Sequence, residues 1–130
     1  MKRFFLLTII LAAGAVAGRV AAQDAASASK RANQQYVLFE SERDKGTNVT
    51  AMYDYLLDSY ANFIKVVEAP DNGQYLEGAK NRLRSLYPYL LNGAVYYSEQ
   101  KQPAKALDLA AAYIDMPQLP VFSSELLPKD

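Results

Sequence analysis

The stretch that decides the fold is residues 89–117, YLLNGAVYYSEQKQPAKALDLAAAYIDMP. Its first half places Leu90, Ala94 and Tyr97 on one side of a helix, because steps of three and four residues return to the same face. Its second half carries a similar apolar set at Ala106, Leu109, Ala110 and Tyr113. The pattern therefore predicts two antiparallel helices that are joined by a short polar turn.

The two predicted helices, residues 86–100 and 103–115, are suited to close packing. Pro103 begins the second helix, where its missing N–H costs nothing. Ala94 and Ala106 are small side chains at the positions where the two backbones would cross. Such a pair buries only part of its apolar surface, so we expect neighbouring helices to cover the rest.

The preceding residues predict three further helices and no strand. Residues 24–45 have apolar side chains in steps of three and four, and Gly46 is suited to closing that helix. Residues 49–68 carry the longest apolar stripe, with Thr47 or Asn48 as the cap, and a third helix spans residues 74–84. The stripe of residues 49–68 consists of Val49, Met52, Tyr53, Leu56, Tyr60, Phe63, Ile64 and Val67, with Asp54, Asp58 and Asn62 on the opposite side.

Pro88 leaves two alternatives for residues 74–100. The proline either kinks one long helix or stands in the first turn of a new helix that Ser85 caps. A helix break is favoured, because proline costs about 3 kcal/mol in a helix interior and little in a first turn. The sequence thus predicts an all-α protein of about five helical segments, followed by an irregular tail at residues 118–130.

The N-terminal residues have the features of a secretory signal peptide. Lys2 and Arg3 precede the apolar run of residues 4–17, and Val20-Ala21-Ala22 is a small-residue cleavage site. Cleavage after Ala22 would leave residues 23–117 as the helical domain. The alternative is a membrane anchor, but the run is shorter than the roughly 18 residues expected of a span. We expect an exported protein of the periplasm or cell envelope that meets a membrane only through an uncleaved leader.

Composition bounds the chemistry of the chain. It contains neither cysteine nor histidine, which removes the commonest metal ligands and the commonest general base. Without Lys2, Arg3 and Arg19, 11 basic residues stand against 14 acidic ones, a net charge of −3. The sequence therefore predicts no cofactor, no metal site and no attraction to nucleic acid.

The spacing of Leu90, Gly93-Ala94, Tyr97 and Ala106 resembles a tetratricopeptide repeat, a helix–turn–helix unit of about 34 residues. Residues 33–67 resemble a second, weaker copy. The phrases DKGTN, APDNGQY, AKNRLRSLYPYLLNGAVYY and AYIDMPQLPVF also resemble the N-terminal region of secreted tetratricopeptide-repeat proteins of Bacteroidetes-type bacteria. The resemblance implies a short α-solenoid of antiparallel helical hairpins.

Two alternatives follow for the C-terminal end of the array. Repeat arrays usually need about three units and a polar cap, and no capping helix follows Tyr113. Either the chain is a shortened family member with an exposed apolar end, or it pairs with itself or with a partner through that end. The resemblance also implies that the chain matches only the N-terminal part of longer family members. Val121, Phe122, Leu126 and Leu127 could fold back over part of that end.

The resemblance implies a non-catalytic scaffold that binds a protein or peptide. Such repeats bind segments in the groove along their first helices, so the candidate interaction residues are Leu91, Val95, Tyr96, Ser98 and Glu99. The alternative is a glycan-binding envelope protein that uses exposed rings of Tyr87, Tyr89 and Tyr96. Packing in helix seams also accounts for the ten tyrosines, since tyrosine combines an apolar ring with a polar tip.

Two charged groups suggest other chemistry. Asp54 and Asp58 lie one helical turn apart like a paired carboxylate, but no nucleophile or base accompanies them. We therefore predict that they are solvated surface acids and that the protein has no catalytic residues. Lys80, Arg82 and Arg84 are expected to stabilise the C-terminus of the helix of residues 74–84, with a phosphate or acidic-partner contact as the alternative.

Overall fold

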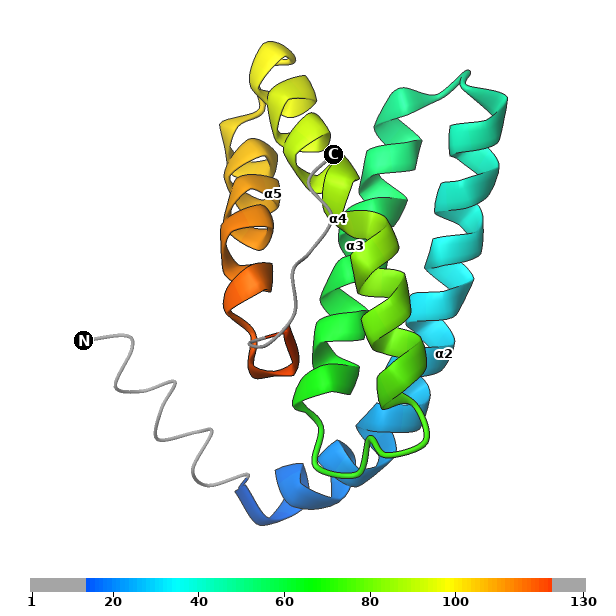
Figure 1. Cartoon of the computed structure of the whole chain (residues 1–130), viewed down its shortest axis with the longest axis vertical. Coiled ribbons are helices and arrows are strands. Elements are labelled where there is room, and N and C mark those ends of the chain that lie inside the picture. Colours follow the sequence, from blue (N-terminus) through cyan, green and yellow to red (C-terminus); the bar gives the residue numbers. More distant parts are fainter. Residues whose placement is uncertain (1–13, 123–130) are drawn as a thin grey trace, which may run out of the picture.

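The computed structural model describes the backbone of residues 14–122 and the side chains of residues 25–122. This part of the chain contains no strand and is built of helices α2 (Gly14–Lys45), α3 (Val49–Glu68), α4 (Leu76–Glu99) and α5 (Pro103–Asp115). Two short 3₁₀ turns follow, η1 (Met116–Gln118) and η2 (Pro120–Phe122). The predicted all-α fold of antiparallel helical hairpins is confirmed (Figure 1).

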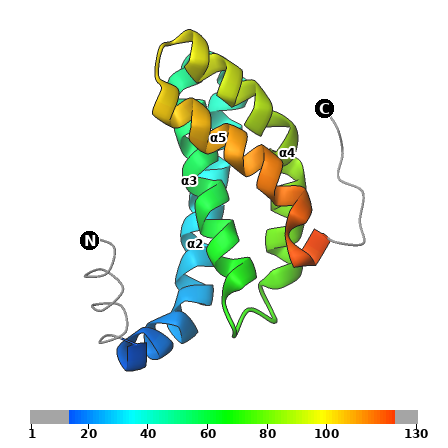
Figure 2. The same ribbon diagram turned by 90° about the vertical axis from the view of Figure 1, so that its left-hand side faces the viewer.

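Two hairpins, α2–α3 and α4–α5, stack so that α3 lies at the centre. The helices of each hairpin pack along one another, and α3 also packs against α4. Figures 1 and 2 place α3 between α2 on one side and the α4–α5 hairpin on the other. Because α3 has neighbours on several sides, it buries more of its circumference than an edge helix does.

The ends of α2 and α3 follow the predicted turn chemistry. Gly46 has a φ of 67°, and its N–H donates to the carbonyl of Glu42 at 2.9 Å, which closes α2 as expected. Asn48, the second of the two cap candidates, accepts a hydrogen bond from the Ala51 N–H at 3.0 Å. The start of α2 differs from the prediction: the helix begins at Gly14 rather than at residue 24. The alanine-rich sequence there favours helix.

Helix α4 corrects the expected helix break. It runs unbroken from Leu76 to Glu99 with Pro88 inside it, so residues 14–122 form four long helices instead of the five segments expected. Proline removes one backbone hydrogen bond, whereas Leu86, Tyr87 and Leu90 beside it are all buried. This packing on both sides of the proline offsets its local cost.

Because α4 is unbroken, the role expected of the basic residues at a helix C-terminus is wrong as well. Lys80, Arg82 and Arg84 lie in the first half of α4, so they cannot stabilise a helix C-terminus. The Arg82 guanidinium carbon instead lies 4.3 Å from the ring centroid of Tyr36 on α2. Stacking of this kind holds an arginine against a neighbouring helix.

The expected polar side of α3 is also wrong in part. Asn62 is 8% exposed and Ser59 is fully buried, where its hydroxyl donates to the Ala32 carbonyl at 2.9 Å. Helical periodicity identifies the more apolar face of a helix, but it does not show that a second helix covers the other side. Here α2 packs on the side that carries Ser59 and Asn62.

Residues 118–122, which were expected to belong to the irregular tail, take part in two 3₁₀ turns and contribute to the core. Met116 is fully buried and Phe122 is 1% exposed, and the Phe122 ring lies 5.5 Å from the Arg84 guanidinium carbon. The fold-back of Phe122 is thus observed, while Leu126 and Leu127 lie outside the described residues.

The tyrosines pack in helix seams. All ten are buried or partly buried. Tyr87 of α4 stacks on Tyr113 of α5 with ring centroids 4.8 Å apart and an interplanar angle of 7°. The seam interpretation of the tyrosine-rich composition is confirmed.

Gly93 marks the point where three helices meet. A Cβ atom at this position would lie 2.9 Å from Leu109 Cδ1 of α5 and 2.9 Å from Tyr53 Cδ1 of α3. Only glycine allows this approach, because both contacts are to side chains that are themselves buried. Gly93 therefore lets the second hairpin pack tightly on α3.

We predict that Gly93→Ala lowers the free energy of unfolding by about 1–3 kcal/mol, because the added methyl group overpacks this junction. Gly78→Ala is the matched control, since Gly78 lies in the same helix with nothing within 4 Å of its added Cβ. The control should be neutral or stabilise by up to about 1 kcal/mol. Urea unfolding followed by circular dichroism measures both values, and equal effects of the two substitutions would contradict the packing described.

Candidate functional site

An open groove runs between α4 and α5. It has a volume of about 500 Å³, within the range of binding pockets in proteins. Its lining is mostly apolar and contains a single charged residue: Ala94, Val95, Ser98, Glu99, Ala106, Leu107 and Ala110.

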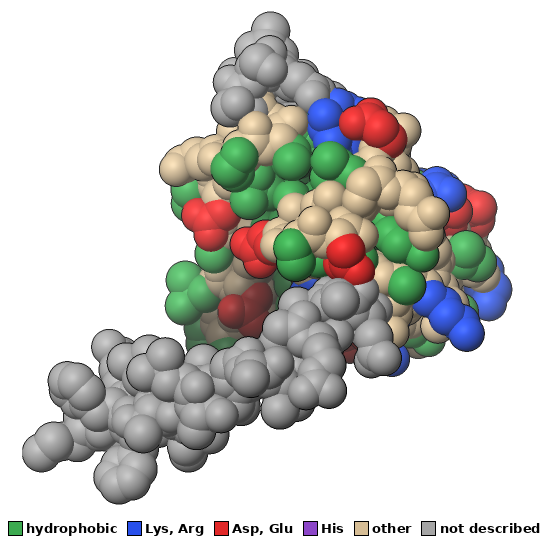
Figure 3. All heavy atoms as spheres, turned by 90° about the horizontal axis from the view of Figure 1, so that it is seen from below, with side chains coloured by type: hydrophobic (Ala, Val, Ile, Leu, Met, Phe, Trp, Pro, Cys, Tyr) green, Lys and Arg blue, Asp and Glu red, His purple; other side chains and the backbone are tan. Residues whose placement is uncertain are grey.

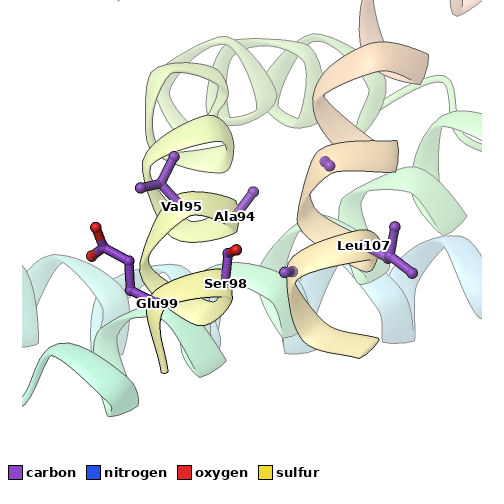
Figure 4. Close-up of a pocket in the computed structure, with 7 residues that line it drawn as sticks. Ala94, Val95, Ser98, Glu99 and Leu107 are labelled. Atoms are coloured by element: carbon purple, nitrogen blue, oxygen red, sulfur yellow. The ribbon is translucent and has the colours of Figure 1, made fainter. Parts of the chain in front are cut away.

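The groove has small walls and raised edges. Figure 4 shows Ala94 and Ser98 pointing from α4 towards α5, whereas Val95 and Glu99 lie on the outer side of α4. Leu107 points away from α4 on the other helix. The groove is therefore shallow, because its walls consist of alanine and serine side chains, and the larger side chains of Val95 and Leu107 stand at its two edges.

Large apolar side chains around the groove are exposed. Val95 is 51% exposed, Leu107 69%, Ile114 60% and Leu91 38%. Ala104 and Ala111 are exposed in the same row of α5 as Leu107 and Ile114, with steps of three and four residues. Exposed apolar side chains gathered on one face are typical of interaction sites.

The predicted interaction residues divide between this face and a helix seam. Val95, Ser98 and Glu99 line the groove, and Leu91 lies one to two turns away on the same side of α4. Tyr96 lies elsewhere: its ring is 5.3 Å from that of Tyr53, and its hydroxyl is hydrogen-bonded to the Thr50 hydroxyl. The structure therefore brings together four of the five residues.

Sequence reasoning missed the half of the groove that α5 contributes. Leu107 was not among the inner residues expected of this helix, and Ala106 and Ala110 were expected to be core rather than groove. The available signal was that Leu107 and Ile114 are large apolar residues that fall outside the predicted inner face.

The tyrosines of the glycan-binding alternative have neighbours on their rings. Tyr87 is 5% exposed, and the Tyr89 ring lies 5.1 Å from Phe39 of α2. Tyr96 packs on Tyr53 as described. None of the three offers a freely exposed flat ring of the kind that stacks on sugars.

Asp54 connects three helices rather than standing free in solvent. Its Oδ1 accepts a hydrogen bond from the Tyr97 hydroxyl of α4 and one from Lys105 Nζ of α5 at 2.9 Å. Burial raises the pKa of Tyr97, and the hydrogen bond to Asp54 raises it further, so the phenol stays protonated. This carboxylate therefore ties α3 to the second hairpin.

Asp58 has the corresponding position towards α2. Its Oδ2 accepts hydrogen bonds from Arg31 Nη2 and Gln35 Nε2, each at 2.6 Å, and its Oδ1 accepts one from Asn62 at 2.7 Å. Burial acts to raise the pKa of Asp58, but the hydrogen bonds from Arg31 and Gln35 outweigh it and lower the pKa. Asp54 is an exposed surface acid, as expected, whereas Asp58 is half-buried, and both acids bridge helices, which was not expected.

We predict that Asp58→Asn lowers the free energy of unfolding by about 1–2 kcal/mol at pH 7, because three donors lose a charged acceptor. The folded-state pKa of Asp58 is lowered, so its contribution is present above the unfolded pKa and is lost as the pH falls through the folded one. The difference between variant and wild type should therefore shrink towards pH 2. Urea midpoints at both pH values measure it, with Asp71→Asn, an exposed acid, as the control. A difference that does not change with pH would contradict this role.

The comparisons with known proteins add no relative. No protein-family model matches the chain, and no curated protein or solved structure matches it significantly. Among the helices formed by residues 14–122, none combines the length and hydrophobicity needed to cross a bilayer.

Proposed function

We propose that this chain is an exported, non-catalytic scaffold of the tetratricopeptide-repeat type that binds a protein or peptide partner through the α4–α5 groove. The observation that carries the proposal is the exposed apolar groove between the two helices of the last hairpin, about 500 Å³ in volume. A chain that folds alone normally covers such a face, so its exposure favours a binding role.

The repeat assignment is supported by the residues that suggested it. Leu90 and Tyr97 are fully buried, and Gly93 allows the close approach to α5 that a repeat hairpin needs. Ala94 of α4 and Ala106 of α5 both line the groove between the two helices.

The absence of catalysis and the envelope location are parts of the same proposal. The two acids that resembled a catalytic pair are occupied by interhelical contacts. The leader of residues 1–22 supports export to the periplasm or cell envelope. The glycan-binding alternative needs exposed aromatic rings, and no observation of these tyrosines favours it.

Site-specific photo-crosslinking in the source cells tests this function. We expect benzoylphenylalanine in place of Val95 to form a discrete adduct whose partner can be identified by peptide mapping. The same substitution at Val37, 59% exposed on α2, is the control and should give little or no adduct. The purified protein should begin at Gln23 by mass spectrometry. Equal labelling at both positions, or none at Val95, would refute a binding role for the groove.

A further inference from the structure

The face that contains the α4–α5 groove concentrates the exposed apolar side chains of the molecule. Seven large hydrophobic side chains are exposed among residues 25–122, and four of them lie on this hairpin: Leu91, Val95, Leu107 and Ile114. The other three are Val37 and Leu38 on α2 and Val49 at the start of α3. The apolar face is therefore a property of the second hairpin.

The shape of this face suits a helix. The groove has alanine walls, with Val95 at one edge and Leu107 at the other (Figure 4). A row of side chains on a partner helix can pack into such a groove, while the side chains at the groove edges contact the two sides of that helix. An amphipathic helix seated in an apolar groove is a common mode of recognition.

Acidic residues border the apolar face on both sides. Glu99 lies on the outer edge of α4, and Asp108 and Asp115 follow Leu107 and Ile114 by one residue on the outer edge of α5. All three are exposed.

Basic residues do not balance these acids. Lys105 of α5 is held by Asp54 at 2.9 Å, and Lys101 lies at one end of the face, in the turn between the helices. The view from below shows the end of the molecule opposite the α4–α5 turn, with acidic side chains among hydrophobic ones on the side where α5 lies and Lys and Arg side chains mainly on the other side (Figure 3). The face is thus apolar in the middle and negative along its edges.

We propose that this groove binds an amphipathic helix of a partner protein whose apolar stripe is bordered by Lys or Arg residues. The inference rests on the proposed function and specifies its partner. Basic flanks would lie opposite Glu99 on one edge and Asp108 and Asp115 on the other, and such complementary charges set specificity and speed association. A second copy of this chain is a poorer occupant, since pairing two such faces would bring acids opposite acids.

Binding of synthetic helical peptides to the purified mature protein tests the proposal. Three peptides of about 18 residues, long enough to form a helix, share one Leu/Ala stripe and carry Lys, Gln or Glu at the flanking positions. By fluorescence anisotropy, we expect the Lys peptide to bind about tenfold or more tightly than the Glu peptide, with the Gln peptide between them. Added salt should reduce this difference, because the charges at the edges are exposed.

Matched variants locate the binding. Val95→Gln with Leu107→Gln keeps the charge unchanged and should weaken the Lys peptide about tenfold or more, whereas Val37→Gln with Leu38→Gln should leave its affinity unchanged. Neutralising Glu99, Asp108 and Asp115 to their amides should remove most of the preference for the Lys peptide. The same change at Asp44, at the end of α2, and at Asp71, in the turn after α3, should preserve it, because both acids are exposed away from the groove.

Several results would overturn the inference. Equal affinity for all three peptides would exclude charge recognition, and equal loss in both Gln variants would exclude the groove. A dimer in sedimentation that Leu107→Gln abolishes would identify a second copy as the occupant. A tenfold gain in affinity on deleting residues 123–130 would identify the chain's own tail. Crosslinking at Val95 without binding of the Lys peptide would refute this partner class alone, whereas failure of the crosslinking would refute the proposed function.

Discussion

The close approach of three helices at Gly93 determines how the second hairpin sits on the first. Leu109 of α5 and Tyr53 of α3 both occupy the space that a side chain at this position would need. The approach draws α5 against α4, so the walls of the groove must be small, and Ala94, Ala106 and Ala110 meet that requirement. The groove is therefore a consequence of the same packing that holds the fold together.

Polar contacts reinforce this arrangement from the central helix. Asp54 reaches Tyr97 and Lys105 on the second hairpin, and Asp58 reaches Arg31 and Gln35 on α2. The two acids are one turn apart on α3. One aspartate therefore ties α3 to the α4–α5 hairpin, and the next ties it to α2. Partly buried carboxylates with several donors fix the relative positions of helices more specifically than apolar contacts do.

Most of the fold could be predicted from local patterns, and the errors share one cause. Apolar periodicity gave the hairpin of residues 89–117, and turn chemistry at Gly46 and Asn48 gave helix ends, because these features depend on nearby residues. The expected break at Pro88, the exposure of Asn62 on α3 and the exposed ring of Tyr87 were wrong. Each depended on which helices are neighbours, and a single sequence does not encode that in a local pattern.

The groove could be predicted only in part for a related reason. Its α4 side follows from the repeat-like spacing around Val95, whereas its α5 side depends on how far that helix is rotated about its axis. A rotation that buries Leu109 and Ala112 leaves Leu107 and Ile114 outside. The sign of this rotation in the sequence was that Leu107 and Ile114 are large apolar residues outside the expected inner face of the helix.

The most direct test of this account is the pattern of nuclear Overhauser effects from Gly93. The structure predicts strong effects from its Hα protons both to the δ-methyl groups of Leu109 and to the ring protons of Tyr53, because all three groups are in contact. Their presence would establish the junction that positions the two hairpins and the groove between α4 and α5. Their absence in a folded, helical protein would contradict the packing on which the groove and its proposed function depend.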